Sequence, residues 1–323
     1  RRKRLVRDVA LAAGFVTYCG PFNSEYRERL QHDHFLAETR AQGVAGSESV
    51  DLVAFLVDQA TIGEWGLQGL PSDDLSVQNG IMVTRSSRYS LMIDPQGQAL
   101  RWIKSREASR MVEGGGRCLT TLTNPRLKED LELCLCDGLP LIIENVEAEV
   151  DPLLDPVLDK TAVKKGKNWF ITVSDTVMEF DSNFVLYMTS RLPNPHFSPE
   201  LSAKCTVIDF TVTLRGLEQQ LLGGVLAVEQ SSLEESLAQL MHDVTANTKA
   251  LVQLDAQLLD RLSATQGNLL DDTELIEMLG NTKAKAKEVE QKLADSEDKK
   301  MEINEKREQY RPVATRGSVM YFC

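Results

Sequence analysis

The pattern of apolar and polar positions changes sharply near residue 214. Before that point, apolar runs of strand length alternate with helical stretches and with joints rich in proline and glycine. After it, no proline occurs until Pro312, and glycine is rare between residues 225 and 310. Such a composition favours uninterrupted helix. We therefore expect an α/β part followed by an all-α part.

Six apolar runs in the first part have the length of strands. They are residues 80–83, 89–93, 139–143, 169–173, 184–188 and 205–212. Helical stretches are expected at residues 1–19, 22–40, 47–60 and 99–106, with a joint of turn-forming residues at 66–74. Strands separated by helical segments predict a mostly parallel sheet flanked by helices.

The second part predicts two long helices, residues 214–264 and 272–310, with a break at 267–272. The first carries apolar residues at steps of three, four or seven, with a polar gap at Thr248, which is typical of a coiled-coil seam. They are Leu233, Leu237, Leu240, Val244, Leu251, Leu254, Leu258 and Leu262. Residues 281–310 balance eight basic against eight acidic side chains, as a solvated helix face does. A long antiparallel helical hairpin is expected, and a compact helical subdomain covering the sheet is the alternative.

The overall charge limits the partners. With 48 acidic and 36 basic residues the net charge is −12, so we expect no nucleic-acid partner. No apolar run approaches the roughly 20 residues that span a bilayer, and the opening residues do not read as a signal peptide, so we expect no membrane partner. Six cysteines without a CxxC pair predict free thiols in a reducing compartment, with Cys134 and Cys136 buried, and no metal site.

Chemistry is expected at the carboxyl ends of the strands. The run 89–93 leads into Asp94, Pro95, Gln96, Gly97 and Gln98, the place of a phosphate-binding loop. Such a loop needs GxxxxGK[ST], whereas here only Gly97 remains and no Lys-Ser/Thr pair follows it. Pro95 lacks a backbone donor, and Asp94 puts an anion where phosphate would sit. We predict a degenerate Walker A loop that binds no cofactor.

The run 139–143 ends in Glu144 and Asn145, where a Walker B strand would end in Asp-Glu. Glu144 could still hold a metal, but neutral Asn145 is a poor general base. The favoured interpretation is a buried strand whose polar end caps neighbouring loops. Thr189, after the run 184–188, has the position of a phosphate sensor, and we expect its hydroxyl to bond the backbone. No catalytic residue is predicted.

Several stretches resemble the fifth AAA+ module of dynein heavy chains. They are residues 69–80, 91–99, 102–104 and 191–200, with further likeness at 5–30, 267–272 and 310–317. The Asn194-Pro195-His196 form of the proline-rich loop is more similar to axonemal than to cytoplasmic dyneins. The resemblance covers nearly the whole chain.

The resemblance implies a division of the chain. Residues 1–40 would join the returning stalk helix to the motor ring, and 41–213 would be the α/β large subdomain. Residues 214–310 would form the helical small subdomain with its strut or buttress hairpin, and 311–323 would begin the sixth module.

It also implies a function. The module would not turn over nucleotide; it would relay ATP-driven rearrangement of the ring through the strut to the microtubule-binding stalk. ATP and Mg would bind in other modules of the parent chain, and no cofactor in this fragment. Partners would be the neighbouring AAA+ modules and the stalk, the microtubule, and dynein intermediate and light chains. The location would be the ciliary or flagellar axoneme, or otherwise the cytoplasm.

A divergent AAA+ module that still binds nucleotide is the main alternative. It would need a Lys or Arg near Asp94–Gln98, and none lies between Tyr89 and Leu100. A coiled-coil scaffold without a motor connection is disfavoured, because an α/β part precedes the long helices.

Overall fold

The chain forms two compact units in a computed structural model that describes residues 5–47, 50–147, 149–264 and 273–323. Unit 1 comprises residues 1–56 and 68–213, and unit 2 comprises residues 57–67 and 214–323. The chain therefore passes between the units three times, at 56–57, 67–68 and 213–214.

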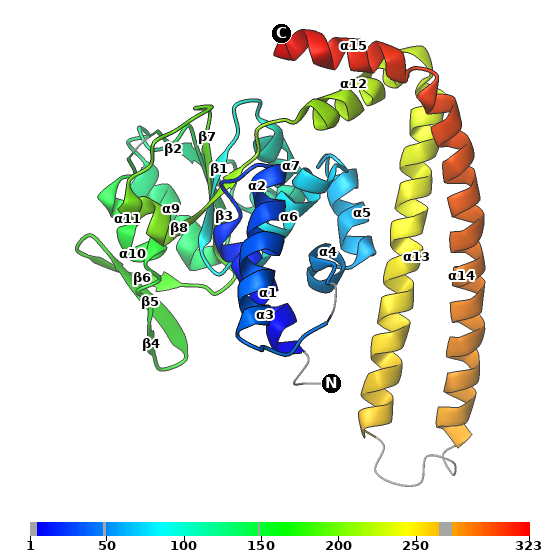
Figure 1. Cartoon of the computed structure of the whole chain (residues 1–323). Helices are drawn as coiled ribbons and strands as arrows, with labels where there is room; N and C mark the ends of the chain where they lie inside the picture. The colour runs from blue at the N-terminus through cyan, green and yellow to red at the C-terminus, as the bar shows by residue number, and fades with distance from the viewer. Residues whose placement is uncertain (1–4, 48–49, 148, 265–272) are drawn as a thin grey trace. The chain divides into compact units, whose positions relative to one another are not determined.

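The centre of unit 1 is a five-stranded sheet with the order β2-β3-β7-β1-β8, and all of its neighbouring strands are parallel (Figure 1). Its strands are β1 (Tyr89–Ile93), β2 (Leu119–Thr121), β3 (Pro140–Glu144), β7 (Val185–Ser190) and β8 (Cys205–Asp209). In register, Ser90 of β1 lies opposite Tyr187 and Thr206. The predicted parallel sheet is confirmed, although the short strand β2 was not predicted.

A second, three-stranded antiparallel sheet lies in the same unit. It consists of β4 (Val163–Lys165), β5 (Asn168–Val173) and β6 (Thr176–Phe180). The run 169–173 is a strand as expected, but it belongs to this sheet and not to the parallel one. Along β5, Ile171 and Val173 are buried while Thr172 between them is exposed, so one face of the small sheet packs on the core.

Helices of unit 1 precede, connect and flank the strands. They are α1 (Leu5–Tyr18), α2 (Ser24–Arg29), the π-helix η2 (Leu30–Leu36), α3 (Ala37–Ala41), α4 (Leu52–Leu56), α6 (Asp74–Arg85), α7 (Gln98–Arg106), α8 (Ala108–Glu113), α9 (Leu127–Asp137), the 3₁₀-helix η3 (Pro152–Leu154), α10 (Asp155–Leu158) and α11 (Pro199–Lys204). The predicted helix 22–40 exists as three consecutive segments with a π-helical middle. The predicted helix 47–60 is instead split between α4 and the start of the next helix.

The prediction of a strand at residues 80–83 is wrong, because these residues lie inside α6. The Asp73 side chain accepts from the Ser76 backbone N–H at 3.2 Å and so caps the start of this helix. Ile81, Met82 and Val83 are all buried. A short apolar run in a helix that is buried on several sides cannot be told from a strand by its pattern alone.

Both faces of the parallel sheet are covered, giving a three-layer α/β/α arrangement. On one face, Leu91 of β1 and Ile143 of β3 share a core cluster with Leu131 of α9. Alternate residues point to the opposite face. There, the Tyr187 hydroxyl donates to Glu107 Oε1 at 2.8 Å, at the end of α7.

Unit 2 is entirely helical in its described residues. It consists of α5 (Gln59–Leu67), α12 (Leu214–Glu229), α13 (Ser231–Ala264), α14 (Thr273–Glu308) and α15 (Arg311–Phe322). Helices α13 and α14 lie side by side and antiparallel, so the predicted hairpin is confirmed (Figure 1). The predicted helix 214–264 is interrupted at Gln230, and the predicted break at 267–272 lies outside the described residues.

A heptad seam joins α13 and α14. Among the described side chains of α14, the buried or half-buried ones are Thr282, Ala286, Val289, Leu293, Ser296, Ile303, Asn304 and Arg307. Apart from Asn304, they recur at steps of three or four, with one step of seven. Those of α13 with the same spacing are Leu233, Leu237, Leu240, Val244, Asn247, Leu251 and Leu254. The polar seam position is therefore Asn247, while the neighbouring Thr248 donates its hydroxyl to the Val244 carbonyl at 2.8 Å. The side chains of Leu258 and Leu262 are outside the described set.

Helix α5 packs closely against α13 within unit 2. A Cβ placed on Gly63 of α5 would lie 2.5 Å from Thr245 Oγ1, so the two helices approach where only glycine fits. Glu64, the next residue, forms an ion pair with Lys249. Residues 57–67 thus brace the hairpin, although 164 positions separate Leu67 from Ser231, where α13 begins.

Candidate functional site

The carboxylate of Asp94, the first residue of the candidate phosphate-loop position, binds backbone N–H groups at the start of α7. Asp94 follows β1 directly and is 2% exposed. Its Oδ1 accepts from the Gln98 backbone N–H at 2.7 Å, and its Oδ2 accepts from the Leu100 N–H at 2.9 Å. These N–H groups belong to the first turn of α7 and have no acceptor within the helix. In nucleotide-binding proteins the corresponding groups point at phosphate. The anion is therefore supplied by the chain itself.

Burial raises the pKa of the Asp94 carboxyl above its ordinary value, whereas hydrogen bonds from the backbone N–H groups of Leu100, Gln98 and Ala99 lower it. The burial effect is the larger. A carboxylate held this deeply would repel a second anion at the same N–H groups.

The rest of the degenerate loop (Asp94–Gln98) also binds within the protein. Gly97 has a φ of 71°, a left-handed conformation that suits glycine. If Gly97 is the last glycine of the motif, Gln98 and Ala99 take the positions of the Lys and the Ser/Thr. The Gln98 side chain carries no charge, is buried and donates to Ser76 Oγ of α6 at 3.2 Å.

Glu144, at the end of β3, is held by a cation of α7. Lys104 Nζ lies 2.7 Å from Glu144 Oε1, and the Glu144 side chain is 17% exposed. The Glu144 side chain is thus bound by a helix side chain and not by a neighbouring loop. This pairing was not predicted from the sequence. Asn145 is exposed with a φ of 56°, a conformation that asparagine tolerates better than most residues.

Thr189 lies buried near the carboxyl end of β7, opposite Met92 of β1. Its backbone carbonyl accepts from the Val146 N–H at 2.8 Å, and the bonding of its hydroxyl stays a prediction. Because β7 lies between β1 and β3, the sheet places Asp94, Thr189 and Glu144 at the carboxyl ends of three neighbouring strands. The structure thus brings the three sequence-predicted positions together, with Asp94 and Glu144 already bound to partners in the chain.

Metal ligands do not gather in the described residues: no group of three or more His, Cys, Asp or Glu side chains there could hold an ion. The described cysteines are free. Cys134 is buried as predicted, but Cys136 is exposed, with its Sγ 3.6 Å from the Glu179 carbonyl of β6.

Arg27 forms a second buried polar site, which the sequence reading missed. It is 1% exposed and binds neutral acceptors. Its Nε donates to the Phe22 carbonyl at 2.8 Å, and its Nη2 donates to the Gly20 carbonyl at 2.9 Å and to Asn79 Oδ1 at 2.7 Å. Burial lowers the pKa of Arg27 to about 10. We call Gly20, Phe22, Arg27 and Asn79 the N-terminal clamp.

The clamp joins the N-terminal helices to the sheet. The Gly20 carbonyl also accepts from the Asp209 N–H at 3.0 Å, and the Asn79 side chain donates to the Asp209 carbonyl at 2.7 Å. Residues 20–27 are thereby fixed to α6 and to the end of β8. In the sequence, Gly20 and Pro21 only follow the predicted helix 1–19, and no local pattern there indicates the contact with β8.

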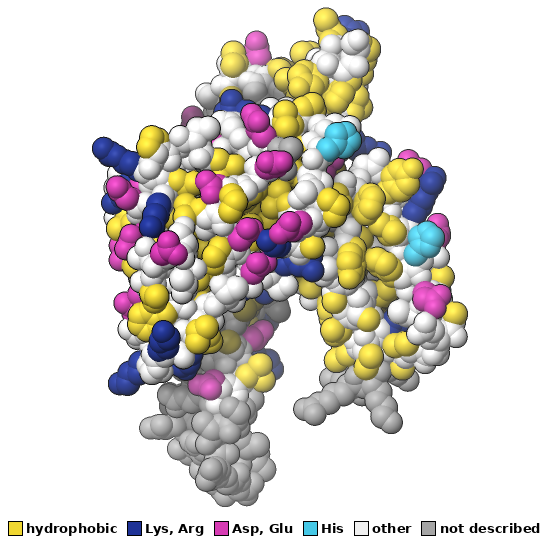
Figure 2. All heavy atoms as spheres, turned by 90° about the vertical axis from the view of Figure 1, so that its left-hand side faces the viewer, with side chains coloured by type: hydrophobic (Ala, Val, Ile, Leu, Met, Phe, Trp, Pro, Cys, Tyr) yellow, Lys and Arg dark blue, Asp and Glu magenta, His cyan; other side chains and the backbone are white. Residues whose placement is uncertain are grey.

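The visible surface is mixed in charge. Figure 2 shows acidic and basic side chains interspersed over the face seen there, with apolar side chains between them. This face offers no extended basic patch among its described atoms, and such a patch is the usual footprint of nucleic-acid binding. In the described part of the chain, no helix has the length and apolar character needed to cross a bilayer.

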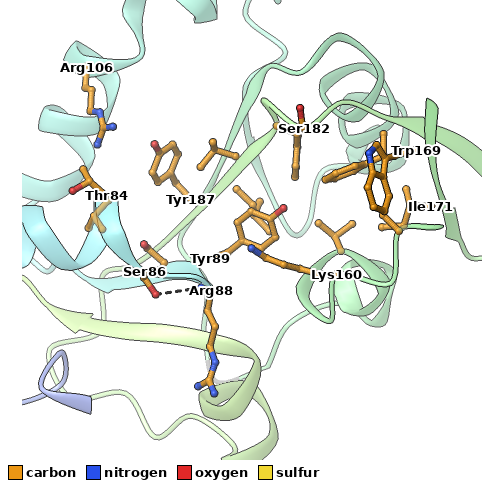
Figure 3. A pocket seen from close by; sticks show the side chains of 18 residues that line it. Thr84, Ser86, Arg88, Tyr89, Arg106, Lys160, Trp169, Ile171, Ser182 and Tyr187 are labelled. Atoms are coloured by element: carbon orange, nitrogen blue, oxygen red, sulfur yellow. Dashed lines mark hydrogen bonds between the residues drawn. The ribbon is translucent and has the colours of Figure 1, made fainter. Parts of the chain in front are cut away.

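A pocket of about 530 Å³ lies at the amino ends of the strands of the parallel sheet. It opens beside the first residues of β1 and β7, and Figure 3 shows Tyr89, Tyr187 and Trp169 around it. Lys160 Nζ lies 4.7 Å from the centre of the Tyr89 ring. Burial raises the pKa of Tyr89 to about 12, so its hydroxyl stays protonated. The pocket is aromatic and cationic, and it is separate from the degenerate loop.

Comparison with known proteins gives the chain a family. Residues 63–289 match the family described as ATP-binding dynein motor region. The chain is 50% identical over 99% of its length to the dynein gamma chain of the flagellar outer arm from Chlamydomonas reinhardtii, and 48% identical over 99% of its length to dynein axonemal heavy chain 5 from Mus musculus. It is 46% identical over 99% of its length to human dynein axonemal heavy chain 8. In each case the chain spans 7% of the relative's length. The chain belongs to the family of dynein motor regions.

Proposed function

We propose that this chain is the fifth AAA+ module of a dynein heavy chain and that it relays motion without turning over nucleotide. The observation that carries the proposal is the carboxylate of Asp94, which accepts from the Gln98 and Leu100 N–H groups at the start of α7. A phosphate would need the same donors.

Three further features support the absence of turnover. Gln98 and Ala99 replace the Lys that contacts the β- and γ-phosphates and the Ser/Thr that holds magnesium. Glu144 pairs with Lys104, and so has its charge already balanced. Asn145 is neutral, so it cannot accept a proton from water. Each of these positions would need a different residue for hydrolysis.

The hairpin α13–α14 is the output of the module in this proposal. Its seam alternates apolar residues with Asn247 on one helix and with Thr282 and Ser296 on the other. Such a seam holds two helices together while keeping the hairpin soluble. As a strut, it would pull on the stalk when the ring rearranges, and a shift between packed stalk helices would change microtubule affinity.

The parent chain would carry the chemistry. ATP and Mg would bind in other modules, and the partners would be the adjacent modules, the stalk, the microtubule, and intermediate and light chains. The relatives bear axonemal and flagellar names, which supports an axonemal location. We propose that residues 1–40 connect the stalk to the ring and that 41–213 form the large subdomain. Residues 214–310 would carry the strut, and 311–323 would begin the next module.

The experiment that tests the proposal is hydrogen–deuterium exchange of the full-length heavy chain with and without saturating ATP plus vanadate. We expect the amides of residues 94–101 to exchange at the same rate in both conditions, because Asp94 already occupies their donors. Protection of these amides by nucleotide would instead support a divergent module that still binds ATP. Peptides from another module that gain protection provide the internal control.

A further inference from the structure

The segment that leads out of unit 1 crosses the degenerate loop. Residues Phe210–Thr213, which we call the connector, follow β8 and precede α12. The Phe210 N–H donates to the Ile93 carbonyl at 2.9 Å, and the Val212 N–H lies 3.5 Å from Gln96 Oε1. Two amides of the connector thus bind the end of β1 and the loop that follows it.

A second link runs through helix α7. The ring of Phe210 lies against the indole of Trp102, with centroids 6.3 Å apart, and both side chains are fully buried. Trp102 belongs to α7, whose first turn is held by Asp94. Asp94 is also tied to β7, because its N–H donates to the Ser190 carbonyl at 2.7 Å. The position of the connector therefore depends on the loop directly and through α7.

We propose that the degenerate loop is a seat for the connector, in which Asp94 takes the place of a bound phosphate and fixes the point where the chain leaves unit 1. The inference deepens the proposed relay and rests on it for its purpose, since the connector leads to the helices that carry the hairpin. Asp94, Gln96 and Trp102 are then positioning residues.

The physical reason is that the Asp94 carboxylate is part of the chain and cannot dissociate from the loop as a bound phosphate can. A nucleotide phosphate binds and dissociates, so the loop that holds it changes state during turnover. The Asp94 carboxylate is covalently attached two bonds from the backbone, which gives it a high effective concentration at the α7 donors. The N–H donors of α7 therefore keep their acceptor in every state of the motor, and the loop that binds the connector keeps one conformation.

Hydrogen–deuterium exchange of the full-length heavy chain tests the seat without microtubules, and so independently of the relay. In Asp94→Ala we expect about tenfold faster exchange both at residues 94–101 and at the connector, because a lost cap frees the first turn of α7 and with it Trp102. Asp94→Asn keeps one acceptor oxygen and should lie between wild type and Asp94→Ala. As a matched control, Ser198→Ala removes the cap of α11, where Ser198 Oγ accepts from Leu201 N–H at 3.1 Å, and should leave the connector unchanged.

A second variant separates the two links and guards against misfolding. Gln96→Met leaves the Asp94 cap in place but removes the acceptor for Val212, so exchange should rise in the connector while Gln98 and Leu100 stay protected. This variant decides the question if Asp94→Ala raises exchange throughout unit 1. The inference is overturned if connector exchange is unchanged in Gln96→Met, or if a folded Asp94→Ala chain loosens residues 94–101 alone.

Discussion

Arg27 Nη2 donates to Asn79 Oδ1 at 2.7 Å, and this buried bond joins helix α2 to helix α6 across 52 residues of sequence. The same nitrogen binds the carbonyl of Gly20, which accepts in turn from the N–H of Asp209 at the end of β8. The N-terminal helices are therefore fixed to the carboxyl edge of the sheet, the edge that also carries Asp94 and the connector. In the proposed relay, an input segment and an output segment meet at this edge.

Replacing Arg27 by Met should strongly destabilise unit 1. The change leaves the Phe22 carbonyl and the Asn79 amide oxygen without their Arg27 donor and takes one of two donors from the Gly20 carbonyl. A buried unpaired acceptor costs roughly 1–3 kcal/mol. We expect a loss of about 3 kcal/mol, measured as the free energy of unfolding in urea. Arg29→Met is the control, because Arg29 makes an exposed ion pair with Glu25 and an exposed contact with the Tyr26 ring, and its loss should cost less than about 1 kcal/mol. Equal effects of the two changes would contradict the clamp.

Gly20→Ala should act on the same junction from the backbone side. A Cβ at this position would lie 2.1 Å from the carbonyl oxygen of Val207, and a backbone atom cannot rotate away. The hydrogen bond between Gly20 and Asp209 should break, at a cost of roughly 2 kcal/mol or more. Gly224→Ala is the matched change, because nothing lies within 4 Å of its Cβ and it sits in helix α12, where alanine should stabilise. A Gly20→Ala chain with the urea midpoint of wild type would rule out the close contact.

Alkaline pH should weaken the fold. Burial raises the pKa of Cys134 to about 12 and that of Cys19 to about 11, whereas thiols of the unfolded chain titrate near pH ~8.5. Above that pH the unfolded chain loses these protons and the folded chain keeps them, so stability falls as pH rises toward the folded values. Urea midpoints measured from pH 8 to pH 10.5 should decline. Cys134→Ala should make the decline shallower, and an unchanged slope would contradict a buried thiol.

Thiol labelling gives a second test of the same burial. In native protein at pH 8, iodoacetamide should modify Cys323 and Cys136, the two exposed cysteines. Cys136 should react more slowly, because burial raises its pKa too. Cys118, Cys134 and Cys205 should become reactive only after denaturation, which peptide mass spectrometry can follow.

In the proposed function Glu144 is paired with Lys104 and takes no part in hydrolysis, so Glu144→Gln should leave ATP turnover by the full-length chain unchanged. Lys104→Met should have a structural effect instead: it leaves the largely buried Glu144 carboxylate without its cation, at a cost of about 1–3 kcal/mol. Lys128→Met, at an exposed lysine that donates to Thr176 Oγ1, is a control for the loss of a lysine. A fall in turnover in Glu144→Gln would mean that this residue serves catalysis.

The sequence pattern predicted those elements whose signal is local. The strands β1, β3 and β7 are apolar runs of five or six residues, and the two long helices lack proline, so both kinds of element were found. The three-residue strand β2 is too short to show a period, and the buried stretch Ile81–Val83 of α6 looks like a strand. That α5 belongs with the hairpin could not be predicted, because it depends on the close approach of Gly63 and Thr245.

In the candidate site, too, the residue types could be read from the sequence, whereas the contacts between distant residues could not. The prediction that Asp94–Gln98 and Asn145 are degenerate follows from which residue types are present. The partners do not: the pairing of Lys104 with Glu144, the binding of Arg27 to Asn79 and the seat of the connector on Gln96 join residues from 40 to 116 positions apart. Such contacts are set by the sheet order, in which β8 lies beside β1 although 111 residues separate the end of one strand from the start of the other.

The relay through the hairpin is the central claim, and the microtubule affinity of the full-length motor tests it most directly. Leu293 lies in the seam of α14 and its neighbour Ala294 is exposed, so Leu293→Asp should disrupt the hairpin while Ala294→Asp should not. The measurement is the ratio of microtubule dissociation constants with ATP plus vanadate and without nucleotide. We predict that Leu293→Asp brings this ratio close to one while basal ATP turnover persists, and that Ala294→Asp keeps the wild-type ratio. A Leu293→Asp motor that retains the wild-type ratio would contradict the relay.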